Sequence, residues 1–139
     1  MVFNLAVNSC RRQIASVAEL RQELVPFDSE QFRHICLAMD RGGPSLSALL
    51  NGNIGWLMYL RHDDGDAGVS SRNLAFDGSP PAPGSPVLLI KYRLSNGQMD
   101  EYPASWALPE QEIMRSLEYF VAHDGERPPF VDWHDNGSK

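Results

Sequence analysis

Two Asn-Gly dipeptides, each lying between two segments of strand length, constrain the fold of this 139-residue chain most strongly. The predicted strands are residues 45–50 and 54–60 around Asn51-Gly52, and residues 87–94 and 99–102 around Asn96-Gly97. Asn and Gly both tolerate positive φ, so this dipeptide is typical of tight β-hairpin turns, and for Asn96-Gly97 we expect a type I′ turn. Residues 87–94 are the strongest strand in the chain. The sequence therefore predicts an antiparallel sheet over its central part.

Two helices are expected outside these hairpins. Ser16 and Glu19 have the spacing of a capping box, and the apolar residues that follow predict a first helix over Val17–Leu24. A second helix is expected to begin with Pro109 at its first position and to end at Gly125. Its buried face is predicted from helical spacing to comprise Ile113, Leu117, Phe120 and Val121.

Three further segments have strand character. Residues 3–7 form a short apolar run, and residues 130–133 alternate between apolar and polar side chains. Residues 31–39 fit either a helix or a buried strand, and we favour the strand. The resulting order predicts one α+β domain over residues 1–139, with a mostly antiparallel sheet and two main helices packed on one face.

The charge of the chain is unevenly distributed. The sequence has 18 acidic and 12 basic residues, a formal net charge of -6, and the whole surplus of negative charge lies in residues 95–139. This balance disfavours binding to nucleic-acid phosphates or to anionic membranes, because both need an excess of Lys and Arg. If the last third folds onto one side, it forms a negative face that attracts a basic partner, whereas the alternative is a surface that only confers solubility.

The N-terminal segment and the cysteines favour a cytoplasmic protein. The opening residues have neither the basic region nor the long apolar run of a secretion signal, and no segment reaches the length of a membrane span. We therefore expect Cys10 and Cys36 to be free thiols, with Cys36 as a small core residue.

Candidate catalytic and metal-binding groups are sparse. His34 and Cys36 lie two residues apart, which places them on one face of a strand without a third group to orient a base, so we expect both to be structural. Two clusters of His and Asp, residues 62–66 and residues 132–135 with His123-Asp124 upstream, lack the spacing of a calcium loop or a zinc site. Each cluster is more often a solvated turn. No metal or cofactor is predicted.

The three tryptophans have different settings in the sequence. Trp56 and Trp133 lie within apolar strands and are expected in the core. Trp106 lies in a loop between two acidic segments, where it either anchors an interface or covers the core beside the last helix. Both interpretations of Trp106 stay open at this point.

A combination of motifs distinguishes the second half of the chain. They are residues 55–59, 86–92, 96–103 and 109–120, the sequence Gly-Glu-Arg-Pro at 125–128 and Val-Asp-Trp at 131–133. With these motifs, residues 45–135 resemble the first immunity-protein family of bacterial polymorphic toxin systems. Members of that family are small cytoplasmic proteins that are encoded beside a secreted toxin, often a nucleic-acid deaminase, and that bind and block it.

The resemblance implies a non-enzymatic inhibitor that binds its cognate toxin one to one, with no cofactor, no direct nucleic-acid contact and no membrane. A toxin that acts on nucleic acid needs a basic cleft, which carboxylates of an inhibitor can fill in place of phosphates. The candidate toxin-binding residues are acids of two segments and the loop tryptophan, namely Asp63, Asp64, Asp66, Asp100, Glu101 and Trp106.

Two other classes of function remain as alternatives. A small metal-dependent hydrolase would use the cluster at His62 or at His134 and would contain stoichiometric metal. An acidic adaptor for another basic protein would have no toxin gene beside its own.

Overall fold

The structure is a computed structural model of the chain, and it describes residues 2–39, 43–61, 68–73 and 88–135. The elements follow in the order β1 (Phe3–Val7), β2 (Cys10–Ile14), α1 (Val17–Leu24), η1 (Val25–Phe27), β3 (Phe32–Met39), β4 (Ser45–Asn51), β5 (Ile54–Leu60), β6 (Val69–Arg72), β7 (Leu89–Arg93), β8 (Met99–Pro103), η2 (Ala104–Trp106), β9 (Leu108–Pro109), α2 (Glu110–Ala122) and β10 (Asp132–Asp135).

One antiparallel sheet of eight strands forms the centre of the fold, in the order β10-β6-β5-β4-β3-β1-β2, with β9 paired to β5. The outer edge of β5 is divided between two partners. At one end β6 pairs with Met58 and Tyr59, and at the other end β9 pairs with Ile54 and Gly55. Between them, the Leu57 backbone N–H donates to the Ser71 hydroxyl at 3.0 Å, so the interrupted edge keeps its hydrogen bonding.

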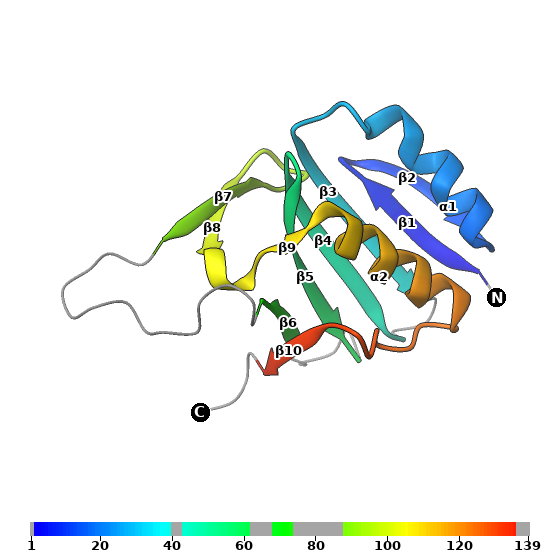
Figure 1. Cartoon of the computed structure of the whole chain (residues 1–139). Helices are drawn as coiled ribbons and strands as arrows, with labels where there is room; N and C mark the ends of the chain where they lie inside the picture. The colour runs from blue at the N-terminus through cyan, green and yellow to red at the C-terminus, as the bar shows by residue number, and fades with distance from the viewer. Residues whose placement is uncertain (1, 40–42, 62–67, 74–87, 136–139) are drawn as a thin grey trace.

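Both helices cover the same face of this sheet (Figure 1). Alternate strand residues point to that face and form the main core with the apolar stripes of α1 and α2. Phe120 of α2 is fully buried, with its ring centroid 5.6 Å from that of Phe3 and 6.3 Å from that of Tyr59. The predicted α+β class, with two helices on one face of an antiparallel sheet, is confirmed.

Two ion pairs connect α2 to the rest of the fold. The Arg21 guanidinium of α1 binds Glu118 in bidentate fashion, at 2.8 Å and 3.0 Å. Arg33 of β3 is almost fully buried, and its Nη2 donates to Glu110 at the start of α2 and to the Gly52 carbonyl oxygen. The first pair joins the two helices, and the second joins the helix to the β4–β5 turn.

The second face of the sheet is covered in part by a separate two-stranded sheet, β7–β8. The segment predicted as the strongest strand thus forms β7 at Leu89–Arg93, but it lies outside the large sheet. Only its alternate residues Ile90 and Tyr92 point inward, while Leu88 and Leu89 are 65% and 46% exposed. An apolar run identifies a strand, but it does not identify the sheet in which the strand lies.

The predicted type I′ turn at Asn96-Gly97 is wrong. Gly97 has a φ of 89°, but Asn96 does not have positive φ. The Leu94 N–H donates to the Gln98 carbonyl oxygen at 2.8 Å, and the Gly97 N–H donates to the Leu94 carbonyl oxygen at 2.9 Å. This is a three-residue loop whose last residue is left-handed, and such a loop needs one positive φ rather than two.

A turn with positive φ at both loop residues occurs instead at Asn8 and Ser9, between β1 and β2, with φ of 46° and 79°. Sequence reasoning missed β2 because, of its five residues, Ile14 alone is buried. It also missed β6, which is short and contains two serines.

The remaining elements agree closely with the predictions. Helix α1 spans the predicted residues, and residues 32–39 form a strand as favoured. Pro109 precedes α2 as its N-cap instead of occupying the first helical position, and Gly125 follows the helix with a φ of 84°. The terminal strand is displaced to Asp132–Asp135, because residues 132–135 are the ones that pair with β6.

Cys36 is not a core residue, which corrects the prediction. It points to the second face of the sheet and is partly exposed, whereas its neighbours Ile35 and Leu37 point into the main core.

In the described chain, neither helix has the length and apolar character needed to cross a membrane.

Candidate functional site

The β7–β8 hairpin is attached to the sheet by a second hydrophobic cluster. Tyr92 of β7 is fully buried and packs against Leu49 of β4 and Trp56 of β5. Burial raises the pKa of the Tyr92 hydroxyl to about 12. Because Leu49 and Trp56 point away from the helices, the sheet carries buried apolar side chains on both faces at this position.

Aromatic rings extend this cluster toward the surface. Trp56 and Tyr102 are stacked with centroids 4.5 Å apart and an angle of 7° between their planes. Tyr102 also lies 5.9 Å from Trp106, and Trp106 lies 4.4 Å from the His134 imidazole, again between centroids. The stack joins β5, β8, the η2 turn and β10, so it holds the hairpin against the end of the large sheet.

The loop that carries Trp106 is held by β6 and by Asn73, the residue that directly follows β6. The Ser71 hydroxyl donates to the Trp106 carbonyl oxygen at 2.7 Å. The Asn73 backbone N–H donates to the Ser105 carbonyl oxygen at 2.7 Å, and its side-chain amide donates to Ala107 at 2.9 Å. The carbonyl oxygens of three consecutive residues, 105–107, thus accept hydrogen bonds, and these hold the backbone that carries the indole in place.

Three of the predicted toxin-binding residues lie in this region. Trp106 is partly buried in the aromatic stack, so it covers the second cluster and leaves part of its ring accessible. Asp100 is partly buried and accepts hydrogen bonds from Gln98 at 2.9 Å and from the Tyr102 hydroxyl at 3.2 Å. Glu101 is exposed on the opposite side of the hairpin. Asp63, Asp64, Asp66 and His62 lie outside the described residues.

The Asp100 carboxylate accepts a hydrogen bond from the Tyr102 hydroxyl. Burial, followed by the charge of Asp100 and its hydrogen bond, raises the pKa of Tyr102. Tyr102 therefore stays protonated near neutral pH and keeps donating to Asp100. Asp100 and Glu101 are neighbours in sequence, but Asp100 stabilises the hairpin from inside while Glu101 faces solvent.

The side of β7–β8 that faces away from the sheet combines apolar and charged residues, and sequence reasoning missed it. Leu89 and Met99 are exposed there, and Lys91 lies opposite Glu101 across the two strands. The signal that could have revealed it is the alternation of Ile90 and Tyr92 with Lys91 and Arg93, which places the charged residues on the outer face of the strand.

His34 and Cys36 are close together, but their hydrogen bonds oppose catalysis. The Cys36 Sγ lies 3.8 Å from His34 Nε2 and 3.0 Å from the Ser47 hydroxyl. His34 Nδ1 accepts the backbone N–H of Ser95 at 3.0 Å, so in the neutral imidazole the proton is on Nε2, the nitrogen nearest the thiol. That nitrogen cannot accept the thiol proton. Burial also raises the pKa of Cys36, which disfavours the thiolate.

The partial burial of His34 predicts a dependence of stability on pH. Burial lowers the pKa of His34 below its ordinary value of 6.5. The unfolded chain therefore takes up the proton more readily, and we expect stability to fall as pH drops from above 6.5 through the folded-state pKa, with no further loss below it. When the free energy of unfolding is measured with urea at several pH values between 5 and 8, it should change less with pH in His34→Gln than in the wild type. The matched change at exposed His123 serves as the control.

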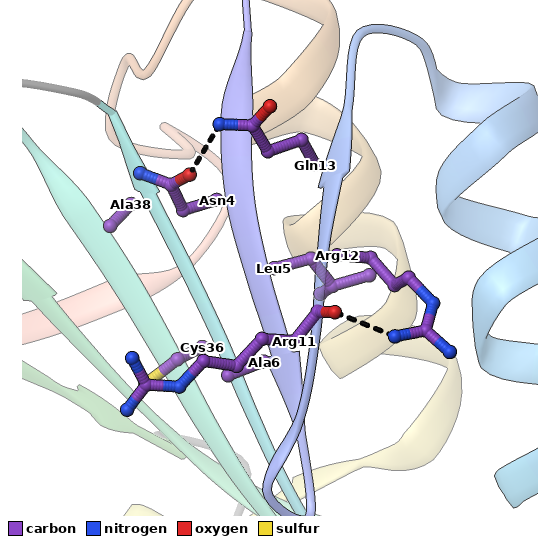
Figure 2. Close-up of a pocket in the computed structure, with 8 residues that line it drawn as sticks. All are labelled: Asn4, Leu5, Ala6, Arg11, Arg12, Gln13, Cys36 and Ala38. Carbon is purple, nitrogen blue, oxygen red and sulfur yellow. Dashed lines mark hydrogen bonds between the residues drawn. The ribbon is translucent and has the colours of Figure 1, made fainter.

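A shallow hollow lies on the open part of the second face, over β1, β2 and β3. It has a volume of about 550 Å³, and Figure 2 shows Arg11 reaching across Ala6 toward Cys36 while Arg12 turns toward α1. Gln13 donates to Asn4 at 3.3 Å along its rim. The hollow is lined by two cationic side chains, Arg11 and Arg12, and otherwise by residues without a formal charge.

Metal ligands are not assembled in the described part of the chain. There, no three His, Cys, Asp or Glu side chains are grouped so that they could hold a metal ion. His123 stacks on Tyr119 with ring centroids 3.8 Å apart, and His134 packs on Trp106. The two histidines of the cluster considered from the sequence are thus engaged with separate aromatic rings.

An exposed hairpin held firmly against a sheet, with apolar and charged residues on its free side, is typical of a protein-binding module. The family described as Immunity protein Imm1 matches residues 8–135, and the chain belongs to this family. The resemblance noted over residues 45–135 is confirmed, and the match extends it toward the N-terminus. A search of curated proteins finds no match.

Proposed function

We propose that this protein binds a cognate secreted toxin, encoded by the adjacent gene, and neutralises it in the cytoplasm of the producing cell without catalysing a reaction. The observation that carries this proposal is the family match over residues 8–135, because members of an immunity-protein family act by binding a toxin. The toxin would be a nucleic-acid-targeting deaminase or nuclease, bound one to one.

Occlusion of a basic cleft is the mechanism that fits the charge of the chain. An enzyme that binds nucleic acid presents Lys and Arg to phosphates, and the surplus negative charge of residues 95–139 complements such a surface. We propose Asp63, Asp64, Asp66, Asp100, Glu101 and Trp106 as contacts. Asp100 would have to give up its hydrogen bond from Tyr102 to bind a partner directly. Glu101 is exposed and can approach a partner as it stands.

Salt should slow the association of the two proteins. Raising the salt from about 0.1 M to about 1 M shortens the Debye length from about 10 Å to about 3 Å, so electrostatic steering should weaken and the association rate should fall roughly tenfold or more. The measurement is stopped-flow or surface plasmon resonance with a catalytically inactive form of the toxin domain. A rate that does not change with salt would contradict recognition of a basic cleft.

Charge reversal should locate the acidic contacts. Glu101→Lys and Asp64→Lys should each slow association several-fold, because each turns an attractive charge into a repulsive one. Glu30→Lys, at an exposed position near the N-terminus, is the matched control and should have little effect. Trp106→Ala should act mainly on the dissociation rate. If affinity is unchanged in all three test variants, the proposed contact residues are wrong.

A further inference from the structure

The outer face of the β7–β8 hairpin exposes an unusual amount of apolar surface. We define this outer face as Leu89, Lys91, Arg93, Met99 and Glu101. Five large hydrophobic residues are exposed in the described chain. Two of them, Leu89 and Met99, lie on this outer face, and a third, Leu88, directly precedes β7. A concentration of this kind on one small element marks a protein-binding surface more often than scattered apolar residues do.

In the part of the chain that the structure describes, no strand pairs with the outer edge of β8. Backbone hydrogen bonds join Leu94 to Gln98 and Leu88 to Ala104, at the two ends of the hairpin. Hydrogen-bonded and non-hydrogen-bonded pairs alternate along two antiparallel strands, so the pairs that contain Met99 and Glu101 are non-hydrogen-bonded. The peptide groups of Met99 and Glu101 therefore point away from β7. Within the described residues β8 pairs with β7 alone, so these groups have no strand beside them.

Pro103 agrees with this geometry. Pro103 is two residues along β8 from Glu101, at a position where a backbone N–H would point away from β7. Because proline has no N–H, it fits this position without breaking a hydrogen bond to β7.

The edge of the large sheet at β2 is protected in a way that β8 is not. Arg12 Nη1 donates to the outward carbonyl oxygen of its neighbour Arg11 at 2.7 Å, and the two adjacent cations discourage another strand from pairing there (Figure 2). On β8 the outward positions are Met99 and Glu101, one apolar and one acidic. A strand with basic and apolar residues would be accepted at this edge.

We propose that the toxin inserts an extended strand beside β8, so that the toxin and the hairpin form a continuous sheet across the interface. This inference rests on the proposed function and specifies its surface. Backbone hydrogen bonds to Met99 and Glu101 supply part of the affinity, and side chains on the outer face supply specificity. At the edge strand itself, a basic toxin residue opposite Glu101 and an apolar one beside Met99 complement the acidic and apolar side chains of these two β8 residues.

Two substitutions at position 101 separate the contribution of the backbone hydrogen bond to binding from the contribution of the carboxylate charge. Glu101→Pro removes the outward N–H and the carboxylate, while Glu101→Gln removes the charge and keeps the N–H. For strand addition, Glu101→Pro should weaken binding of the inactive toxin domain at least tenfold more than Glu101→Gln does. Equal losses in the two variants would show that only the charge matters and would overturn the proposal.

Apolar contacts are tested by Met99→Asp and Leu89→Asp. Each position is 46% exposed, so folding should tolerate the change, and each variant should lower affinity at least tenfold. Val25→Asp, at an apolar residue that is 62% exposed in η1, is the matched control and should bind as wild type does. Loss of binding in the control as well would indicate general disruption and would count against this surface.

Amide exchange measured by NMR gives a residue-level test that does not depend on any variant. In the free protein the amides of Met99 and Glu101 should exchange quickly while those of Asp100 and Tyr102 are protected, and toxin binding should slow Met99 and Glu101 selectively. Unchanged exchange at both residues in a complex that forms and neutralises the toxin would overturn strand addition and leave the proposed function intact. No complex with the toxin domain would overturn the proposed function itself.

Discussion

Replacing Tyr92 with alanine should detach the β7–β8 hairpin and lower the free energy of unfolding by about 3–5 kcal/mol, the usual cost of truncating a buried aromatic side chain. The ring is fully buried between the hairpin and Leu49 and Trp56 of the sheet. A two-stranded hairpin is marginally stable alone, so β7 and β8 depend on this cluster for their conformation. Toxin binding should also be lost, although Tyr92 is too deeply buried to touch a partner.

The control for this prediction is Tyr92→Phe, which keeps the ring and removes only the hydroxyl. We expect it to be close to wild type in stability and in toxin binding. Urea unfolding measures the loss of stability, and amide exchange at Asp100 and Tyr102 reports the release of the hairpin. If Tyr92→Ala leaves those amides protected, the hairpin is held by something other than the second cluster.

The main core could be predicted because its residues repeat with the period of their element. Ser16 caps α1 as expected, its hydroxyl accepting the Glu19 backbone N–H at 3.1 Å. The apolar stripe of α2 is buried at each predicted position, including Ile113 and Phe120. Local chemistry determines these features, so one segment of sequence contains enough information to find them.

The second cluster could not be predicted in the same way. The strand at Leu89–Arg93 was expected from its composition, but its place beside β4 and β3 depends on Leu49 and Trp56, which are distant in the sequence. In β5, Trp56 and Leu57 are both buried because each faces a different layer. From the sequence, helices were expected on one face of the sheet only, and the element that covers the second face was not predicted.

Candidate contact residues were predicted by type of side chain, and the structure separates them by orientation. Asp100 and Glu101 appear equivalent in sequence, but a strand sends consecutive side chains to opposite faces. Asp100 is bound to Tyr102, and Glu101 remains accessible. Trp106 covers the second cluster with a ring that is only partly buried, and its role as an interface anchor stays a prediction.

The buried ion pair between Arg33 and Glu110 predicts the second large loss of stability. Arg33 is 3% exposed, and its partners are the Glu110 carboxylate and the Gly52 carbonyl oxygen, which accepts at 2.8 Å. Glu110→Ala leaves a guanidinium inside the protein without its counter-charge, and removing one partner of a buried pair costs about 3–5 kcal/mol. The Glu110 side chain is itself 39% exposed, so water can reach the site and the loss should be about 3 kcal/mol.

A matched control and a double variant distinguish this pair from general effects on α2. Glu112→Ala removes another acid from the first turn of the helix, where Glu112 is 3.8 Å from exposed Arg115, and should cost about 1 kcal/mol or less. The double variant Arg33→Met with Glu110→Ala removes both charges and should recover most of the stability lost in Glu110→Ala, because no buried cation remains. Chemical unfolding measures all three variants. If the double variant is no more stable than Glu110→Ala, the loss arises from the helix N-terminus and not from an uncompensated charge at Arg33.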